Sequence, residues 1–185
     1  MPMDDPALVE SLRSGDPQAP RLLIERYQGV VFGLCYRMMN HQQDAEDVTQ
    51  ETFIRALRAM PGFDATRPIR PWLLEIAANR CRTALRQRPR TSVGGSLNLN
   101  QAVAPSTGES RDLADELETA VCELRDDYRL CFLLFYQEDL SCAEIANVMN
   151  CPEGTVKTWL HRARRELADR LRRRGVVPHV EYQLH

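Results

Sequence analysis

Apolar side chains recur every three or four residues along most of the chain, which is the period of an amphipathic helix. In the first half, this period predicts helices that contain residues 8–12, 23–38, 48–60 and 73–85. Asp44 fits the N-cap of the third helix, and Pro71 fits the first turn of the fourth, which we expect to run to about Arg88. No convincing strand pattern is present, so the sequence predicts an all-α fold.

The helical pattern stops in the middle of the chain. Residues 89–111 are rich in Pro, Gly, Ser, Thr and Asn and show little periodicity, which is typical of a flexible linker. This segment divides the chain into two small helical domains, residues 1–88 and 112–174, followed by a short tail at 175–185. In the second domain, a helix containing Leu113–Leu124 precedes one that Asp126 or Asp127 is expected to cap.

The last two predicted helices carry the most informative pattern. Ser141 and Glu144 have the spacing of a capping box, Asn150 and Cys151 turn the chain, and Pro152 begins the next helix. Two short helices joined by such a turn predict a helix-turn-helix within a four-helix domain. The second helix has a buried stripe formed by Val156, Leu160, Ala163 and Leu167. Its exposed face is predicted to carry the DNA-binding residues Thr155, Lys157, Thr158, His161, Arg162 and Arg165. The alternative is a helical hairpin with a solvated basic face.

The charge distribution favours a polyanionic partner. The chain holds 24 basic and 26 acidic residues, for a net charge of −2. However, residues 61–90 carry 7 basic and 2 acidic side chains, and residues 157–174 carry 8 and 2. Two basic segments between acidic blocks are expected of a protein that binds nucleic acid.

Other classes of protein receive little support. The six cysteines form no C-x-x-C pair and lie at no zinc-ligand spacing with the four histidines, so we interpret them as small, reduced core residues. A redox role for Cys142 or Cys151 is the alternative. With no nucleophile–base constellation or phosphate loop, the sequence predicts no enzyme, metal or cofactor. The acidic start and the absence of a long apolar run predict a cytoplasmic protein without membrane insertion.

Three ordered motifs resemble the bacterial extracytoplasmic-function sigma factors. Residues 44–53, Asp-Ala-Glu-Asp-Val-Thr-Gln-Glu-Thr-Phe, are similar to the first domain of that family. Residues 63–79, which include Arg70-Pro71-Trp72-Leu73, resemble its promoter-melting and −10-reading part. Residues 140–167 resemble its −35-reading domain. The resemblance covers roughly residues 8–172, in the family's order.

The resemblance implies a dissociable subunit of RNA polymerase that recognises −35 and −10 promoter elements and helps open the duplex. The first domain would dock on the polymerase clamp helices and the second on the flap, and the resemblance implies an anti-sigma factor as a further partner. Four residues are candidates for docking: Asp47, Gln50, Glu51 and Arg55. The candidates for −10 DNA binding are Phe63, Asp64, Arg67, Arg70, Asn79, Arg80, Arg82 and Arg86. We expect Trp72 to belong to the core.

One competing function uses the same helix-turn-helix. A stand-alone transcriptional regulator would bind DNA without docking on polymerase. Such a regulator has no need for the segment 44–53 together with the loop 63–73, whereas a sigma factor needs both. The first domain therefore favours the sigma-factor interpretation.

Overall fold

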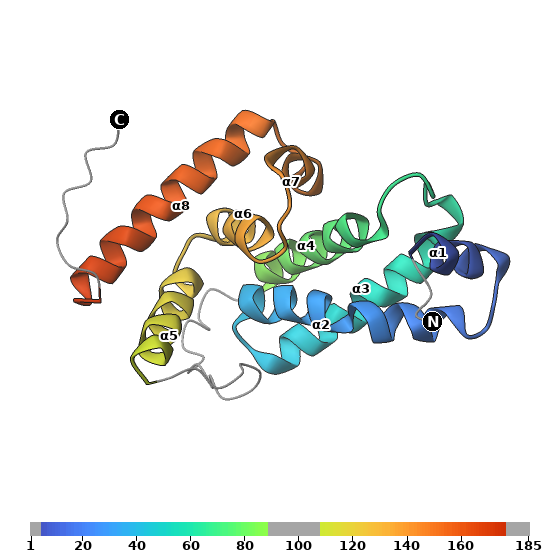
Figure 1. The fold of residues 1–185 in the computed structure, drawn as a ribbon, viewed down its shortest axis with the longest axis horizontal. Helices are drawn as coiled ribbons and strands as arrows, with labels where there is room; N and C mark the ends of the chain where they lie inside the picture. The colour runs from blue at the N-terminus through green and yellow to red at the C-terminus, as the bar shows by residue number, and fades with distance from the viewer. Residues whose placement is uncertain (1–4, 89–107, 177–185) are drawn as a thin grey trace.

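The structure is a computed structural model that describes residues 5–88 and 108–176, with the side chains of 108–112 excepted. Within these ranges every regular element is a helix (Figure 1). The N-terminal helices are α1 (Asp5–Ser14), α2 (Ala19–Met39), α3 (Gln42–Ala59), the 3-10 helix η1 (Met60–Gly62) and α4 (Ile69–Gln87). The C-terminal helices are α5 (Gly108–Cys122), α6 (Asp126–Tyr136), α7 (Cys142–Met149) and α8 (Glu153–Arg173). The predicted all-α fold class is confirmed.

The N-terminal helices pack around the apolar stripes that the sequence predicts. Helices α2, α3 and α4 contact one another, and α1 packs against α2 and η1. Leu23, Leu34, Leu73 and Leu74 are fully buried between them. Burial of each such side chain contributes about 1.5–3 kcal/mol, so these leucines set the relative positions of α2 and α4.

Of the two helix starts predicted in this half, that of α3 is wrong and that of α4 is confirmed. Asp44 is not an N-cap, because Asn40 adopts a left-handed conformation and α3 begins at Gln42, with His41 as its N-cap. Asp44 lies instead in the first turn of α3, where a carboxylate interacts favourably with the helix dipole. Pro71 does lie in the first turn of α4, which extends to Gln87 as expected.

The C-terminal helices form the predicted helix-turn-helix. Helix α8 packs against α5, α6 and α7. The capping box is confirmed: Glu144 N donates to Ser141 Oγ over 3.2 Å, and Ser141 N donates to the Glu144 carboxylate over 2.8 Å. Asn150 ends α7 in a left-handed conformation, and Pro152 is the N-cap of α8.

Two further boundaries differ from the sequence prediction. Arg125, rather than Asp126 or Asp127, is the N-cap of α6, and both aspartates lie in its first turn. Helix α5 begins at Gly108, so the last residues of the predicted linker 89–111 are helical. The rest of that linker, and the tail from residue 177, lie outside the described residues.

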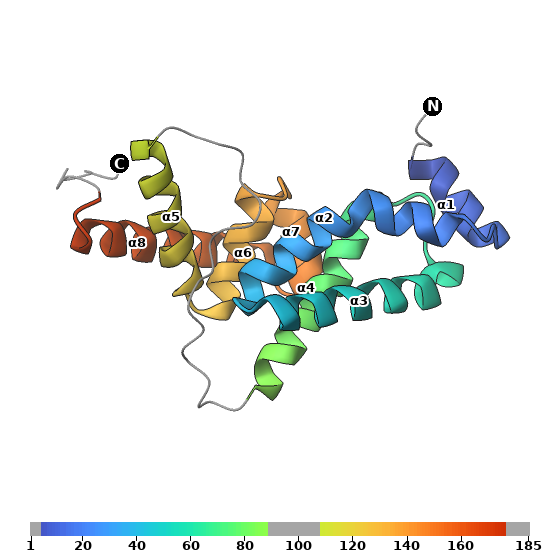
Figure 2. The same cartoon turned by 90° about the horizontal axis from the view of Figure 1, so that it is seen from below.

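The two groups of helices pack directly against each other. Helix α7 lies against α4, and α6 lies against α2 (Figures 1 and 2). Figure 2 shows α1 and α8 towards opposite ends of the molecule. The buried apolar side chains form one cluster that includes residues of both groups. The α4–α7 contact therefore brings the C-terminal helices onto a helix that the sequence assigns to DNA binding.

Candidate functional site

Helix α8 has a buried side and a polar exposed side. Val156, Leu160, Ala163 and Leu167 are buried, as their +4, +3, +4 spacing predicts. The predicted DNA-binding residues on the other side are exposed, except Thr155, which is half-buried near the helix start; the exposed residues are Lys157, Thr158, His161, Arg162 and Arg165. The hydrophobic stripe thus fixes the rotation of α8 and orients its basic face towards solvent.

Several of these side chains are held close to the helix surface. Lys157 pairs with Glu153 over 2.7 Å. The Thr158 hydroxyl donates to the Gly154 carbonyl over 2.8 Å. Arg162 Nη1 donates to the hydroxyl oxygen of Tyr128 on α6 over 3.1 Å. This hydrogen bond to α6 fixes the position of the Arg162 guanidinium on the exposed face of α8.

The predicted docking residues share an exposed face of α3. Asp47, Gln50, Glu51 and Arg55 are exposed, whereas Val48, Thr52, Phe53 and Ala56 point into the core. The structure adds Ile54, whose side chain is 48% exposed beside them. Sequence reasoning missed Ile54 because an apolar residue within a helix is normally assigned to the core. Its position outside the buried stripe was the available signal.

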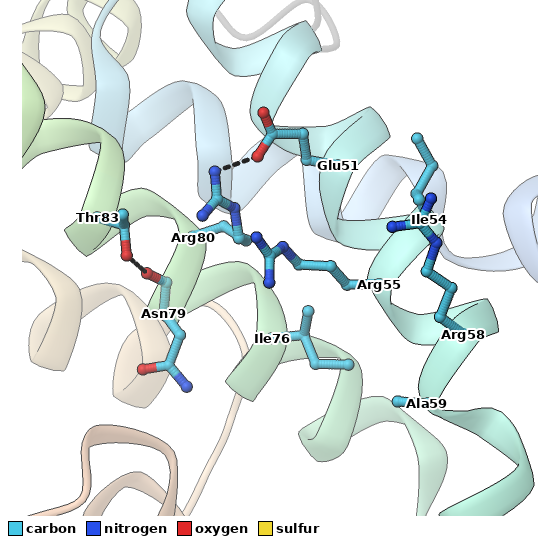
Figure 3. Close-up of a pocket in the computed structure, with 9 residues that line it drawn as sticks. All are labelled: Glu51, Ile54, Arg55, Arg58, Ala59, Ile76, Asn79, Arg80 and Thr83. Atoms are coloured by element: carbon cyan, nitrogen blue, oxygen red, sulfur yellow. Dashed lines mark hydrogen bonds and ion pairs between the residues drawn. The ribbon is translucent and has the colours of Figure 1, made fainter.

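A groove of about 840 Å³ runs between α3 and α4 (Figure 3). It is lined by Glu51, Ile54, Arg55, Arg58, Ala59, Ile76, Asn79, Arg80 and Thr83. The sequence assigns Glu51 and Arg55 to polymerase docking and Asn79 and Arg80 to DNA binding. The structure brings all four together in this one groove, so the two predicted surfaces are continuous.

Direct contacts link the two walls of the groove. Arg80 of α4 donates a hydrogen bond to the carboxylate of Glu51 on α3 (Figure 3). On α4 itself, the Thr83 hydroxyl donates to the Asn79 carbonyl over 2.9 Å, and the Asn79 side chain is exposed. An amide and several guanidinium groups therefore line a groove that also contains the apolar side chains of Ile54 and Ile76.

The loop between η1 and α4 is anchored by an aromatic contact. Phe63 is buried, and its ring centroid lies 4.5 Å from that of Trp72. The ring of Phe63 thus packs into the N-terminal core, and its contact with DNA stays a prediction. Trp72 is partly buried and packs against the same core, as expected.

Asp64 organises the turn that follows Phe63. Its Oδ1 accepts hydrogen bonds from Thr66 N over 3.0 Å and from the Thr66 hydroxyl over 2.8 Å. These bonds hold the pKa of the Asp64 carboxyl below its usual value. Arg67 is exposed and lies 3.9 Å from the carboxylate of Glu75. Asp64 thus shapes the loop on which Arg67 faces solvent.

The remaining basic residues of α4, and Arg88 at its C-cap, differ in what they contact. Arg70 and Arg82 contact the C-terminal helices: Arg70 bonds to Glu138, and Arg82 Nη1 lies 3.3 Å from the Met149 carbonyl oxygen. Arg86 is exposed. Arg88 bonds to Asp44 and to the Met39 carbonyl, which ties the end of α4 to α2 and α3. Neither contact with the C-terminal helices was expected from the sequence.

The cysteines occupy two kinds of environment. Cys35, Cys81 and Cys131 are buried, whereas Cys122, Cys142 and Cys151 are half-buried. The sulfur atoms of Cys35 and Cys81 lie 3.8 Å apart. Within residues 5–88 and 108–176, no group of three or more His, Cys, Asp or Glu side chains has an arrangement that could hold a metal ion. In that same part of the chain, no helix combines the length and apolarity needed to span a bilayer.

Comparison with known proteins identifies the class. Residues 23–91 match the family model of sigma-70 region 2, and residues 114–167 match that of sigma-70 region 4. The α3–α4 groove thus belongs to region 2 and the basic face of α8 largely to region 4. The chain therefore has the two conserved regions of a sigma-70-type factor.

Sequence identity with individual relatives shows which family the chain belongs to. The sigma factor SigW of Bacillus subtilis is 32% identical over 89% of this chain and 95% of its own length. The RNA polymerase sigma-H factor of Pseudomonas aeruginosa is 36% identical over 86% and 90%. The chain belongs to the extracytoplasmic-function (ECF) RNA polymerase sigma factors, which direct promoter-specific initiation of transcription.

Solved structures agree with this assignment. The structure of CnrH in complex with the cytosolic domain of CnrY matches with a TM-score of 0.68 and 26% identity, over 91% of this chain and 97% of the matched chain. The sigma factor RpoE of Bartonella quintana, solved with the anti-sigma factor NepR, shares the fold with a TM-score of 0.68 at 23% identity.

Proposed function

We propose that the two halves of this sigma factor divide the work of initiation between the surfaces described above. In this proposal, residues 1–88 dock on the polymerase clamp helices and read and melt the −10 element. Residues 112–174 read the −35 element, and the segment 89–111 connects them. The observation that carries the proposal is the α8 face, where buried apolar residues alternate with exposed basic ones.

The −35 contacts are assigned to the N-terminal part of α8. A helix-turn-helix inserts its second helix in the major groove and reads bases with residues near that helix start. Lys157, Thr158, His161, Arg162 and Arg165 are exposed there, and arginine and lysine donate to guanine O6 and N7. The arginines farther along α8 suit phosphate contacts, which position a protein without specifying sequence.

The −10 contacts are assigned to α4 and the loop before it. Opening a promoter removes bases from the stack, which costs a few kcal/mol per step. The exposed amide of Asn79 would contact an unstacked base, while Arg67, Arg70, Arg80, Arg82 and Arg86 would hold backbone phosphates. Phe63 and Asp64 belong to the same proposed −10 surface, on a loop that the Phe63–Trp72 ring contact and the Asp64–Thr66 hydrogen bonds hold in place.

The docking contacts are assigned to α3. Exposed Asp47, Gln50, Glu51 and Arg55 form a charged edge, and such an edge gives orientation and association rate more than raw affinity. We add Ile54 to this surface, because its exposed side chain supplies apolar area within the charged edge.

Partners and location follow from the same proposal. Core polymerase and promoter DNA are the partners of the family. We propose an anti-sigma factor as a third, since CnrH was solved in complex with the cytosolic domain of CnrY and RpoE in complex with the anti-sigma factor NepR. We expect the chain to act in the cytoplasm and to carry out no covalent chemistry itself, because the polymerase performs RNA synthesis.

The decisive experiment is run-off transcription from a library of random promoters by core polymerase with and without this chain. A defined set of transcripts that requires both components supports the proposal. Sequence-specific binding by the free chain at physiological salt, with no polymerase-dependent transcripts, would instead support a stand-alone regulator.

A further inference from the structure

The start of α8 carries a carboxylate to which the proposed function gives no role. Glu153 is the first residue of that helix, and its Oε1 atom lies 2.7 Å from Nζ of Lys157, one helical turn further on. The Glu153 side chain is 47% exposed and that of Lys157 is 65% exposed. The hydrogen bond to Glu153 and the charge of its carboxylate raise the pKa of Lys157. Both members of this ion pair are therefore charged at neutral pH.

The start of α8 is open to a partner. Pro152, Glu153 and Gly154 are all exposed. In the part of the chain that the structure describes, no atom outside the adjacent helix backbone lies within 4 Å of the place that a Cβ on Gly154 would occupy. A helix-turn-helix brings the N-terminal residues of its second helix closest to the base edges. Glu153 would therefore enter the major groove together with Lys157.

A carboxylate in the major groove is selective about the base that it meets. It only accepts hydrogen bonds, and the phosphates on either side of the groove repel it. Guanine and thymine present acceptors to the major groove, so they repel the carboxylate as well. Adenine presents the N6 amino group next to the N7 acceptor, whereas cytosine presents the N4 amino group without an acceptor beside it. The base that suits Glu153 best is therefore cytosine.

The ion pair as a whole matches one kind of base pair. Cytosine N4 and guanine O6 are hydrogen-bonded to each other within a C·G pair, at roughly 2.9 Å. The Glu153 oxygen and the Lys157 nitrogen have almost the same separation, 2.7 Å. A carboxylate has a second oxygen and an ammonium has further donors, so both groups can contact the base pair without breaking their ion pair.

We propose that Glu153 and Lys157 together recognise a C·G base pair in the −35 element, with Glu153 accepting from cytosine N4 and Lys157 donating to guanine O6 or N7. This inference rests on the proposed function, in which α8 reads that element. It makes Glu153 a specificity-determining residue that acts by repulsion of guanine and thymine as well as by attraction of cytosine. An ion pair that only supported the helix would leave base preference unchanged.

The test uses run-off transcription by core polymerase together with the full chain. The promoter library has a randomised −35 region, and a barcode in the transcribed part reports which promoter gave each transcript. The variants are Glu153→Gln, Lys157→Ala and the matched control Glu166→Gln. Glu166 is a suitable control because it lies on the same helix and also pairs with a basic residue four positions further on, Arg170, over 3.7 Å.

We expect the wild-type chain to prefer C·G over each other base pair by roughly tenfold at one position of the −35 element. Glu153→Gln should shift that preference to A·T, because glutamine binds adenine N6 and N7 bidentately and Lys157 can still donate to thymine O4. Lys157→Ala should weaken the preference at the same position. Glu166→Gln should keep the wild-type preference.

The results that would overturn the inference separate it from the proposed function. If the wild type has a −35 preference that Glu153→Gln leaves unchanged, Glu153 does not read DNA, and the proposed function stands. If Glu153→Gln weakens the C·G preference without any gain at A·T, Glu153 only orients Lys157, and the inference fails. If the wild type has no preference in the −35 region, the assignment of α8 fails together with the inference.

A second substitution keeps the test decisive if Glu153→Gln does not fold, which circular dichroism would show. Glu153→Ala removes the carboxylate and should admit guanine and thymine at the position where the wild type rejects them. Continued rejection of both bases by Glu153→Ala would overturn the inference.

Discussion

Glu51 on α3 is ion-paired with Arg80 on α4, and this contact joins two surfaces to which different partners are assigned. Glu51 is proposed to dock on polymerase, and Arg80 is proposed to hold promoter DNA. Half of the Glu51 side chain is exposed, whereas the Arg80 side chain is 16% exposed. A partner that approaches α3 therefore reaches the Glu51 carboxylate before the Arg80 guanidinium. Any bond from the partner to Glu51 competes with the ion pair between Glu51 and Arg80.

The docking surface predicts a charge-reversal effect. Replacing Asp47 and Glu51 together by Lys should abolish association with core polymerase, because it turns the charged edge of α3 from acidic to basic. Both side chains are exposed, so circular dichroism should remain unchanged. The measurement is co-purification with polymerase, and Glu10→Lys, at an exposed position of α1, is the control. Undiminished co-purification of the double variant would contradict the docking assignment.

The basic face of α8 predicts a promoter-specific effect. Arg162→Ala should weaken recognition of the −35 element by about 1–3 kcal/mol if the guanidinium contacts a base. Tyr128→Phe removes only the hydroxyl that Arg162 bonds and should have a smaller effect, because the charge remains. Transcription by reconstituted holoenzyme from −35 variants measures both, with exposed Arg21→Ala as the control. Full activity of Arg162→Ala would show that this face of α8 is assigned wrongly.

The capping box predicts an effect on stability. Ser141→Ala should lower the free energy of unfolding of the C-terminal helices by about 1 kcal/mol, because a donor at the start of α7 loses its acceptor. Chemical denaturation followed by circular dichroism measures the change. Ser14→Ala, at the exposed end of α1, is the control and should leave the unfolding midpoint almost unchanged.

The same capping box predicts a dependence on pH. Hydrogen bonds from Ser141 lower the pKa of Glu144 below its ordinary value of 4.5. A depressed pKa means that the contribution to stability is present above about pH 4.5 and is lost as the pH falls through the folded-state value. Wild type should therefore lose stability on acidification more steeply than Ser141→Ala. Equal slopes for the two proteins would argue against this contribution.

The burial of the cysteines predicts their reactivity. Half-buried Cys122, Cys142 and Cys151 should be alkylated by iodoacetamide well before Cys35, Cys81 and Cys131. Burial raises the pKa of Cys131 to about 12, so little of its reactive thiolate exists near neutral pH. Mass spectrometry of native protein sampled over time gives the order, and the unfolded chain supplies the reference rates. Early labelling of Cys35 or Cys81 would show that the N-terminal core opens readily.

Local patterns were good predictors of local structure here. The Ser141–Glu144 spacing predicted a capping box because both bonds form within one helical turn. The stripe from Val156 to Leu167 predicted which side of α8 is buried, since a 3.6-residue period leaves one apolar face to bury. The sequence predicted Asp44 as the N-cap of α3. In the structure, left-handed Asn40 ends α2, so α3 begins at Gln42, before Asp44.

By itself, the sequence determined the helices, the rotation of α3 and α8 about their axes, and the motifs of the ECF sigma family, because these depend on spacings within a few residues. Only the tertiary structure decided which of the basic side chains of α4 are paired within the molecule. Arg70 and Arg82 carry the same charge as exposed Arg86, but Glu138, which follows α6, and Met149 of α7 supply them with acceptors. Such pairings join groups nearly 70 residues apart, and they depend on how two packed helical surfaces meet.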